Sequence, residues 1–127
     1  MNLEKVVFGF FIILAMTLNF GFVLGDIDNP AHHHVYELFF SIIVNLIATV
    51  LKFGERTQIG AIHLASSLVA DLGLLSAAWV WVSAVYFEGT GLTPGVTASI
   101  VSLSAGALAA NVLSVIMLLV ETVMFRR

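Results

Sequence analysis

Residues 60–87 read GAIHLASSLVADLGLLSAAWVWVSAVYF, and this stretch decides the fold. It contains no Lys or Arg, and Asp71 is its single carboxylate. A helix that crosses a bilayer needs about 20 consecutive, mostly apolar residues. The stretch is therefore predicted to be a membrane-spanning helix, and its extra length allows it to tilt or to project beyond the bilayer.

Three further stretches, at about residues 6–24, 35–53 and 95–124, have the same character. The chain of 127 residues is 60% hydrophobic and 10% charged, whereas soluble domains carry roughly 25% charged residues. Its apolar residues run on continuously, and the strands of a membrane barrel would need them to alternate. The sequence therefore predicts one all-α domain over residues 1–127, an integral membrane four-helix bundle with the lipid bilayer as its medium.

The positions of the basic residues predict how the helices are oriented. Lys5 precedes the first helix, Lys52 and Arg56 flank the connection between the second and third, and Arg126 and Arg127 follow the fourth. The other two connections contain no Lys or Arg. The positive-inside rule therefore places both termini in the cytoplasm, with the chain forming two antiparallel hairpins. Aromatic side chains would then gather at the outer interface: Tyr36, Trp79, Trp81 and Tyr86.

Two connections carry signals for helix starts. Asn29-Pro30 and Thr93-Pro94 each place a typical N-cap residue directly before a proline suited to the first helical turn. A cleaved signal peptide over residues 1–25 is the alternative for the first helix. It is disfavoured because Glu4 offsets the charge of Lys5 and because the apolar region is long for a signal sequence.

Polar residues occur at similar depth in all four predicted helices. Counted from Gly60 at ~1.5 Å per residue, Asp71 lies roughly 16 Å into its helix, close to the bilayer midplane. The other helices supply Thr17 and Asn19, Asn45, and Asn111. One interpretation is a site for a proton or monovalent cation, with the charge on Asp71 and neutral ligands from the asparagines. The other is a set of interhelical hydrogen bonds that only fix the helices together.

Two polar rows extend this pattern at four-residue spacing, which places their members along one helix face. One row is His63, Ser67 and Asp71, and the other is Glu37, Ser41, Asn45 and Thr49. Facing rows would form a polar seam inside one bundle, or would line a pathway if several copies assembled around an axis. A third row, on the fourth helix, consists of small residues that favour close helix packing: Ala98, Ser102, Gly106, Ala110 and Ser114.

The triplet His32-His33-His34 lies between Asp28 and Glu37, outside the predicted helices. Imidazoles near carboxylates suit zinc, nickel or copper. If Pro30 begins the second helix, His33 and Glu37 share a face and could bind a metal together. The alternative is a hydrated helix start at the outer interface.

Several classes of function are excluded or disfavoured by what the sequence lacks. It has no cysteine, so thiolate metal sites, disulfides and cysteine nucleophiles are excluded. Its net charge of −3 offers nothing to attract nucleic acid. Catalytic, phosphate-binding and potassium-filter motifs are absent. We therefore expect neither enzymatic activity nor a cofactor.

Several runs resemble a small proteobacterial inner-membrane family that is known only as a domain of unknown function. They are GDIDNP at 25–30, YELF at 36–39, NLIATVLKFG at 45–54, RTQIGA at 56–61 and SLVADL at 67–72. The resemblance covers nearly the whole chain. It implies a multi-pass protein of the bacterial inner membrane that is associated with potassium-channel-type proteins, and it supplies no catalytic residues.

Together these observations favour a small inner-membrane subunit that works in an oligomer or beside a larger membrane transport protein. The transport protein would be a channel or transporter for monovalent cations, with potassium suggested by the resemblance. One alternative is a self-sufficient homo-oligomeric pathway for ions or protons through the polar residues around Asp71. Another is a structural or assembly scaffold without transport activity.

Overall fold

The computed structural model describes residues 3–53 and 58–124, and every regular element within these ranges is a helix. The long helices are α1 (Leu3–Val23), α2 (Val35–Lys52), α3 (Gln58–Val82) and α4 (Pro94–Met124). The short elements are the 3-10 helix η1 (Pro30–His32) and the π-helical turn η2 (Ser83–Phe87), which continues α3. Four helices are long and apolar enough to cross a membrane, and the described residues contain no strand, so that part of the prediction is confirmed. The basic residues Arg56, Arg126 and Arg127, and also Gly54, lie outside the described residues.

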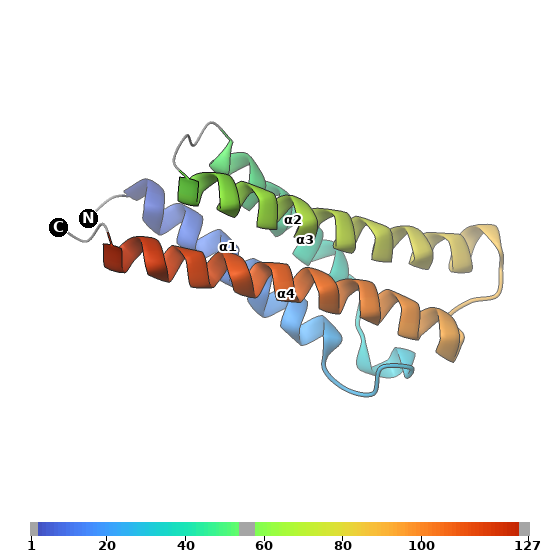
Figure 1. Cartoon of the computed structure of the whole chain (residues 1–127). Coiled ribbons are helices and arrows are strands. Elements are labelled where there is room, and N and C mark those ends of the chain that lie inside the picture. Colours follow the sequence, from blue (N-terminus) through green and yellow to red (C-terminus); the bar gives the residue numbers. More distant parts are fainter. Residues whose placement is uncertain (1–2, 54–57, 125–127) are drawn as a thin grey trace.

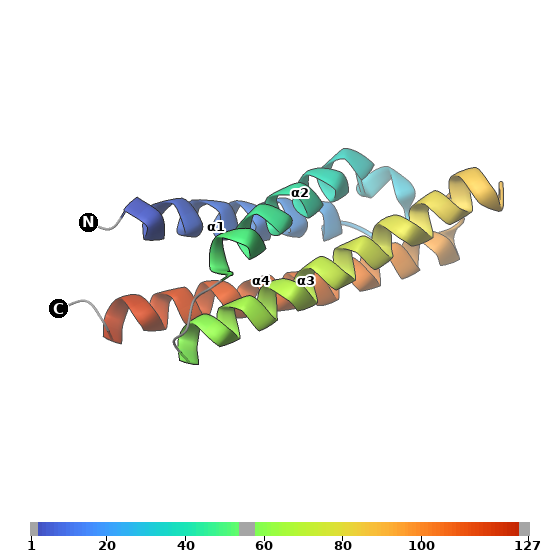
Figure 2. The same ribbon diagram turned by 90° about the horizontal axis from the view of Figure 1, so that it is seen from above.

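The four long helices form a ring in which each one packs against two neighbours. α1 contacts α2 and α4, and α3 contacts the same two helices from the other side. Figures 1 and 2 show the start of α1 and the end of α4 at one end of the bundle, together with the end of α2 and the start of α3. We call this the terminal end, and we call the opposite end, which carries η1 and η2, the far end.

Each helix buries residues at alternating steps of three and four positions. On α1 the buried positions are 8, 12, 15, 19 and 22, and on α2 they include 38, 41, 45, 48 and 52. On α3 they include 63, 67, 70, 74 and 77, and on α4 97, 100, 104, 107, 111, 114 and 121. This spacing is typical of side chains that interlock as in a coiled coil, the packing of most four-helix bundles.

Small residues bring α3 and α4 close together. A Cβ added to Gly73 would lie 3.1 Å from the backbone oxygen of Leu103 and 3.2 Å from the Cβ of Ala107. The predicted packing row on α4 does not make this contact as a whole. Ala110 and Ser114 are buried, but Ser102 and Gly106 are exposed. Successive positions in a four-residue row turn by about 40° around a helix, so a long row leaves the interface.

α2 begins at Val35, as predicted, but the helix-start signal at Asn29-Pro30 does not belong to it. Asn29 does cap a helix, with its side chain accepting a hydrogen bond from the N–H of Ala31, but that helix is the short η1. α2 begins only at Val35, so His33 and Glu37 do not share a helix face. The second signal is confirmed: α4 begins at Pro94, and the hydroxyl of Thr93 accepts a hydrogen bond from the N–H of Val96.

The exterior of the bundle is apolar, whereas its interior contains both apolar and polar side chains. Large apolar side chains lie exposed on every long helix, among them Phe10, Phe40, Leu72 and Leu119. Tyr36, Trp79 and Tyr86 are exposed near the far end, and Trp81 packs edge-on against Phe39 and Tyr86. A soluble protein would bury such apolar side chains, and only lipid accommodates so many of them outside. The chain is therefore a multi-pass membrane protein.

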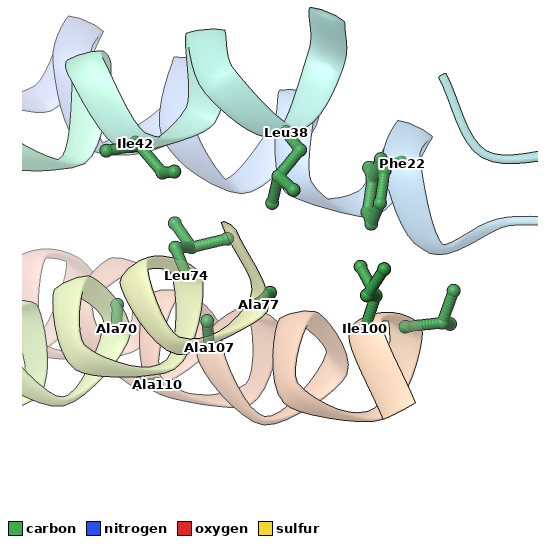
Figure 3. Close-up of a cluster of buried hydrophobic side chains, with 10 residues drawn as sticks. Phe22, Leu38, Ile42, Ala70, Leu74, Ala77, Ile100, Ala107 and Ala110 are labelled. Atoms are coloured by element: carbon green, nitrogen blue, oxygen red, sulfur yellow. The ribbon is translucent and has the colours of Figure 1, made fainter. Parts of the chain in front are cut away.

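Apolar side chains fill the interior toward the far end. Phe22, Leu38 and Ile42 from α1 and α2 face Leu74 and Ile100 from α3 and α4 across the bundle (Figure 3). Leu38 and Leu74 are completely buried. We call these five residues and their neighbours Ala70, Ala77, Val101, Ala107 and Ala110 the apolar cluster.

Candidate functional site

The site is centred on Asp71, which lies buried in the middle of α3 and is only 6% exposed. The hydroxyl of Thr49 on α2 donates a hydrogen bond of 2.6 Å to Oδ2 of Asp71. The same hydroxyl lies 2.9 Å from the carbonyl oxygen of Asn45, one turn earlier on α2. The carboxylate is therefore held at the contact between α2 and α3.

Several buried polar atoms around Asp71 have no hydrogen-bond partner among the described residues. They are the other carboxylate oxygen of Asp71, both amide atoms of Asn45 and of Asn111, and the hydroxyl of Ser67. Asn45, Asn111 and Ser67 are completely buried. A buried polar group without a protein partner costs roughly 1–3 kcal/mol unless water or an ion supplies the missing bond. Three helices thus direct unsatisfied polar groups into one region.

Asn19 connects α1 to this region. In the orientation that satisfies both of its amide atoms, Asn19 donates to the carbonyl of Ser104 and accepts from the N–H of Leu108, at 3.0 Å each. The hydroxyl of Ser104, also buried, has no partner within the described part of the chain. Asn19 and Ser104 therefore mark the level at which the polar interior meets the apolar cluster.

Thr17 does not belong to the site. It is exposed on the outer surface of α1, where its hydroxyl donates to the carbonyl of Ile13 in the same helix. Positions two apart on a helix point about 200° away from each other. Because Asn19 faces the interior, Thr17 has to face outward, and its inclusion in the predicted cluster was wrong.

A second group of polar side chains continues from Asp71 toward the terminal end along α3. His63 and Ser67 follow at four-residue steps and are completely buried. Beside them, the hydroxyls of Ser66 on α3 and Ser114 on α4 lie 2.5 Å apart. The predicted row His63, Ser67 and Asp71 therefore does face the interior.

At the terminal end the polar side chains of the interior are followed by a group that we call the charged cluster. It contains one side chain from each long helix: Lys5, Lys52, His63 and Glu121. Lys5 forms an ion pair with Oε1 of Glu121, and the Nε2 atom of His63 lies 3.5 Å from Oε2 of Glu121. Lys52 lies over the ring of Phe8, 4.3 Å from its centroid, and also interacts electrostatically with Glu121. The ring of Phe8 meets that of His63 edge to face, with centroids 5.3 Å apart.

Sequence reasoning missed Glu121 because it lies near the end of a predicted helix, where an acidic residue is commonly solvated. Glu121 is only 5% exposed. The sequence signal that could have identified Glu121 as buried is its seven-residue spacing from Ser114, which itself lies seven residues from Ala107. A seven-residue repeat keeps a residue on the interior face of a bundle helix.

His33 is buried at the far end, and both of its ring nitrogens contact backbone carbonyls. Nδ1 lies 2.5 Å from the oxygen of Phe22, and Nε2 lies 2.7 Å from the oxygen of Asp26. A neutral imidazole can donate to only one of these oxygens, whereas an imidazolium can donate to both. His33 therefore ties the end of α1 to η1, and in this geometry neither nitrogen offers a lone pair to a metal.

Within residues 3–53 and 58–124, no group of three or more His, Cys, Asp or Glu side chains could hold a metal ion. A small cavity of about 20 Å³ lies beside His33, and it is lined by Trp81 and Thr97 among others. The indole N–H and the hydroxyl of these two residues lack partners in the described ranges. A cavity of this size holds about one water molecule.

The chain was compared with protein-family models, curated proteins and solved structures. No curated protein and no solved structure matches the chain. The family described as "Family of unknown function (DUF6394)" matches residues 32–122, a range that contains α2, α3, most of α4 and every interior polar residue named above except Lys5 and Asn19. This chain, with its four helices able to cross a membrane, therefore belongs to the DUF6394 family, whose function is unknown.

Proposed function

We propose that the protein is a transport component of the membrane, in which the polar interior of a single bundle carries a monovalent cation or a proton. The observation that supports this most is the set of polar atoms around Asp71, contributed by α2, α3 and α4, that have no hydrogen-bond partner among residues 3–53 and 58–124. Helices held together by interhelical hydrogen bonds alone would pair these groups with one another. Ionisable residues inside a membrane are costly and commonly mark a route for ions or protons.

The route is open to polar species over only part of its length. Polar side chains extend from the charged cluster at Glu121 through Asp71 to Asn19 and Ser104. Beyond them the interior is filled by the larger members of the apolar cluster, Phe22, Leu38, Ile42, Leu74 and Ile100 (Figure 3). Hydrophobic constrictions of this kind close channels by excluding water. The described arrangement therefore corresponds to a closed state.

The basic residues support an orientation for this route. Lys5 and Lys52 lie at the terminal end, whereas Asp26, Asp28 and Glu88 lie at the far end. By the positive-inside rule the terminal end faces the cytoplasm and the apolar cluster lies toward the outside. We propose accordingly that the protein spans a bacterial inner membrane with both termini in the cytoplasm.

Flux through liposomes tests the proposal. Purified protein is reconstituted, and the movement of protons and of potassium is recorded separately for the natural chain, Leu74→Ser and Asp71→Asn. Leu74→Ser should raise the flux, because a hydroxyl in the apolar cluster lets water enter the constriction. Asp71→Asn should abolish it, alone and in combination with Leu74→Ser, because the amide cannot carry the charge.

Asp28→Asn is the matched control, since Asp28 is an exposed acid outside the helices. It should leave the flux unchanged. Flux that is absent from both the natural chain and Leu74→Ser would refute the proposal. Flux that survives Asp71→Asn would show that the route does not pass this carboxylate.

The second candidate is a subunit of a larger membrane assembly, with further copies of the chain or with a transport protein. A shallow apolar groove of about 480 Å³ on the outer face between α3 and α4 favours it. The small residues Ala65, Gly106 and Ala109 line this groove, and small residues let a further helix approach closely. Gly106→Leu would then lower the fraction of the protein found in complexes without affecting the folded chain.

A further inference from the structure

The geometry of the charged cluster points to the proton as the ion that this interior carries, taken up at the terminal end by Glu121 and His63. This inference rests on the proposed function, because it names the ion for the same interior. It introduces a role for Glu121, Lys5 and Lys52 that the region around Asp71 does not reveal.

Every long helix contributes one charged or titratable side chain to the cluster. Lys5 comes from α1, Lys52 from α2, His63 from α3 and Glu121 from α4. Glu4 also lies at this end, exposed on α1 beside a shallow groove between α1 and α2. His63, Lys52 and Glu121 are buried, whereas the side chain of Lys5 is 49% exposed. Lys5 is thus the member of the cluster that water reaches most readily.

The charges of the cluster oppose a metal cation. Lys5 occupies one oxygen of Glu121, the ring of His63 faces the other, and Lys52 lies nearby. An alkali metal ion would have to displace an ammonium group and pass a second one, against a repulsion that the low dielectric of the interior strengthens. A carboxylate beside an imidazole is instead a common arrangement for accepting and releasing protons.

The proton can be followed step by step with its charge balanced. A hydronium ion at the terminal end gives its proton to the Glu121 carboxylate, and becomes water, when the ammonium group of Lys5 moves away. The carboxylic acid passes this proton to Nε2 of His63, which leaves a carboxylate and an imidazolium. The imidazolium releases its Nδ1 proton, and Nδ1 lies on the opposite side of the ring from Glu121.

From His63 the proton moves along one face of α3 to Asp71. His63, Ser67 and Asp71 follow one another at a rise of about 6 Å per step, which one bridging water can span. The Asp71 carboxylate accepts the proton on Oδ1, the oxygen without a partner among the described residues, and becomes neutral. The hydroxyl of Thr49 keeps Oδ2 in place throughout.

The charge state of His63 tests this inference without any transport measurement. Protein with ¹⁵N-labelled histidine is reconstituted in bilayers, and the ring signals of His63 are assigned by their loss in His63→Gln. The ratio of imidazolium to imidazole is then measured at one fixed pH in the natural chain, Lys5→Gln and Glu121→Gln. Glu88→Gln, at an exposed acid of the far end, is the control.

The two variants should shift the ratio in opposite directions, each by about tenfold. Lys5→Gln should raise it, because the charge of Glu121 then faces His63 without a competing ammonium group. Glu121→Gln should lower it, because the ring loses the carboxylate 3.5 Å away. Because the side chain of Lys5 is half-exposed, the Lys5→Gln variant should fold normally. The measurement on this variant therefore tests the inference even if Glu121→Gln does not fold.

If the ratio of imidazolium to imidazole at His63 were the same in all of these proteins, proton uptake by Glu121 and His63 would be refuted. Liposome flux carried by potassium and not by protons would overturn the choice of ion, while the proposed function would stand. Absence of flux for both ions would contradict the proposed function itself. The two failures are therefore distinguishable.

Discussion

Gly73→Leu is expected to destabilise the bundle by about 3 kcal/mol or more, the upper part of the range for overpacked interiors. A Cβ at this position already lies 3.1 Å from the backbone oxygen of Leu103, and backbone cannot move aside as a flexible side chain can. The further carbons of leucine would force α3 and α4 apart. Reversible unfolding in detergent or bicelles, followed by the loss of helix signal, measures the effect.

Gly106→Leu is the matched control on the partner helix. A Cβ at Gly106 meets nothing within 4 Å, because this glycine faces outward in the shallow groove. The substitution should leave the stability of the isolated chain unchanged or raise it slightly, since leucine favours helices more than glycine does. Equal losses of stability in the two variants would contradict the packing of α3 on α4.

Glu121→Ala is expected to cost roughly 3–5 kcal/mol of stability, the range for breaking a buried ion pair by removing one partner. Without Glu121, the buried Lys52 loses the negative charge with which it interacts. The contribution from Lys5 is smaller, because its half-exposed side chain can turn to water.

Glu88→Ala serves as the reference for Glu121→Ala in the same unfolding measurement. Glu88 is exposed at the far end, and substitutions at such positions change stability by less than about 0.5 kcal/mol. If both alanine variants unfolded alike, the charged cluster would not be stabilising the terminal end, and Glu121 would have to be solvated.

The helices could be predicted closely because long apolar runs leave a chain few choices. In lipid every backbone polar group has to be bonded internally, so an isolated span of this composition forms a helix. The predicted second helix, at about residues 35–53, corresponds to α2 at Val35–Lys52. The signal at Asn29-Pro30 marks a helix start without saying which helix begins there, and here that helix is the short η1.

The interior was harder to predict because it depends on how the helices turn toward one another. The four-residue spacing correctly placed His63, Ser67 and Asp71 on the interior face of α3. A row of only three residues turns little around the helix, so all of its members stay on that face. The longer row on α4 drifted out of the interface at Ser102 and Gly106. Buried positions follow one another at alternating steps of three and four residues, which together make a seven-residue repeat. A search for this repeat on α4 would have identified Glu121 as an interior residue.

The ion pair between Lys5 and Glu121 could not be found by any local pattern. The two residues are 116 positions apart, and they meet only because the start of α1 and the end of α4 lie at the same end of the bundle. The positive-inside rule places Lys5 at the membrane surface, but it does not say which acidic residue it contacts. Such long-range pairs require the arrangement of the helices in space.

Water in the interior is the property on which the transport role most directly depends. In bilayers containing the labelled protein, magnetisation is transferred from water protons to individual side chains, and the build-up rates are compared by solid-state NMR. The amides of Asn45 and Asn111 should receive it faster than the methyl groups of Leu68 and Leu72, which lie on the exposed side of α3. Amides that receive it no faster than these methyl groups would show a dry interior and would contradict a polar route through the bundle.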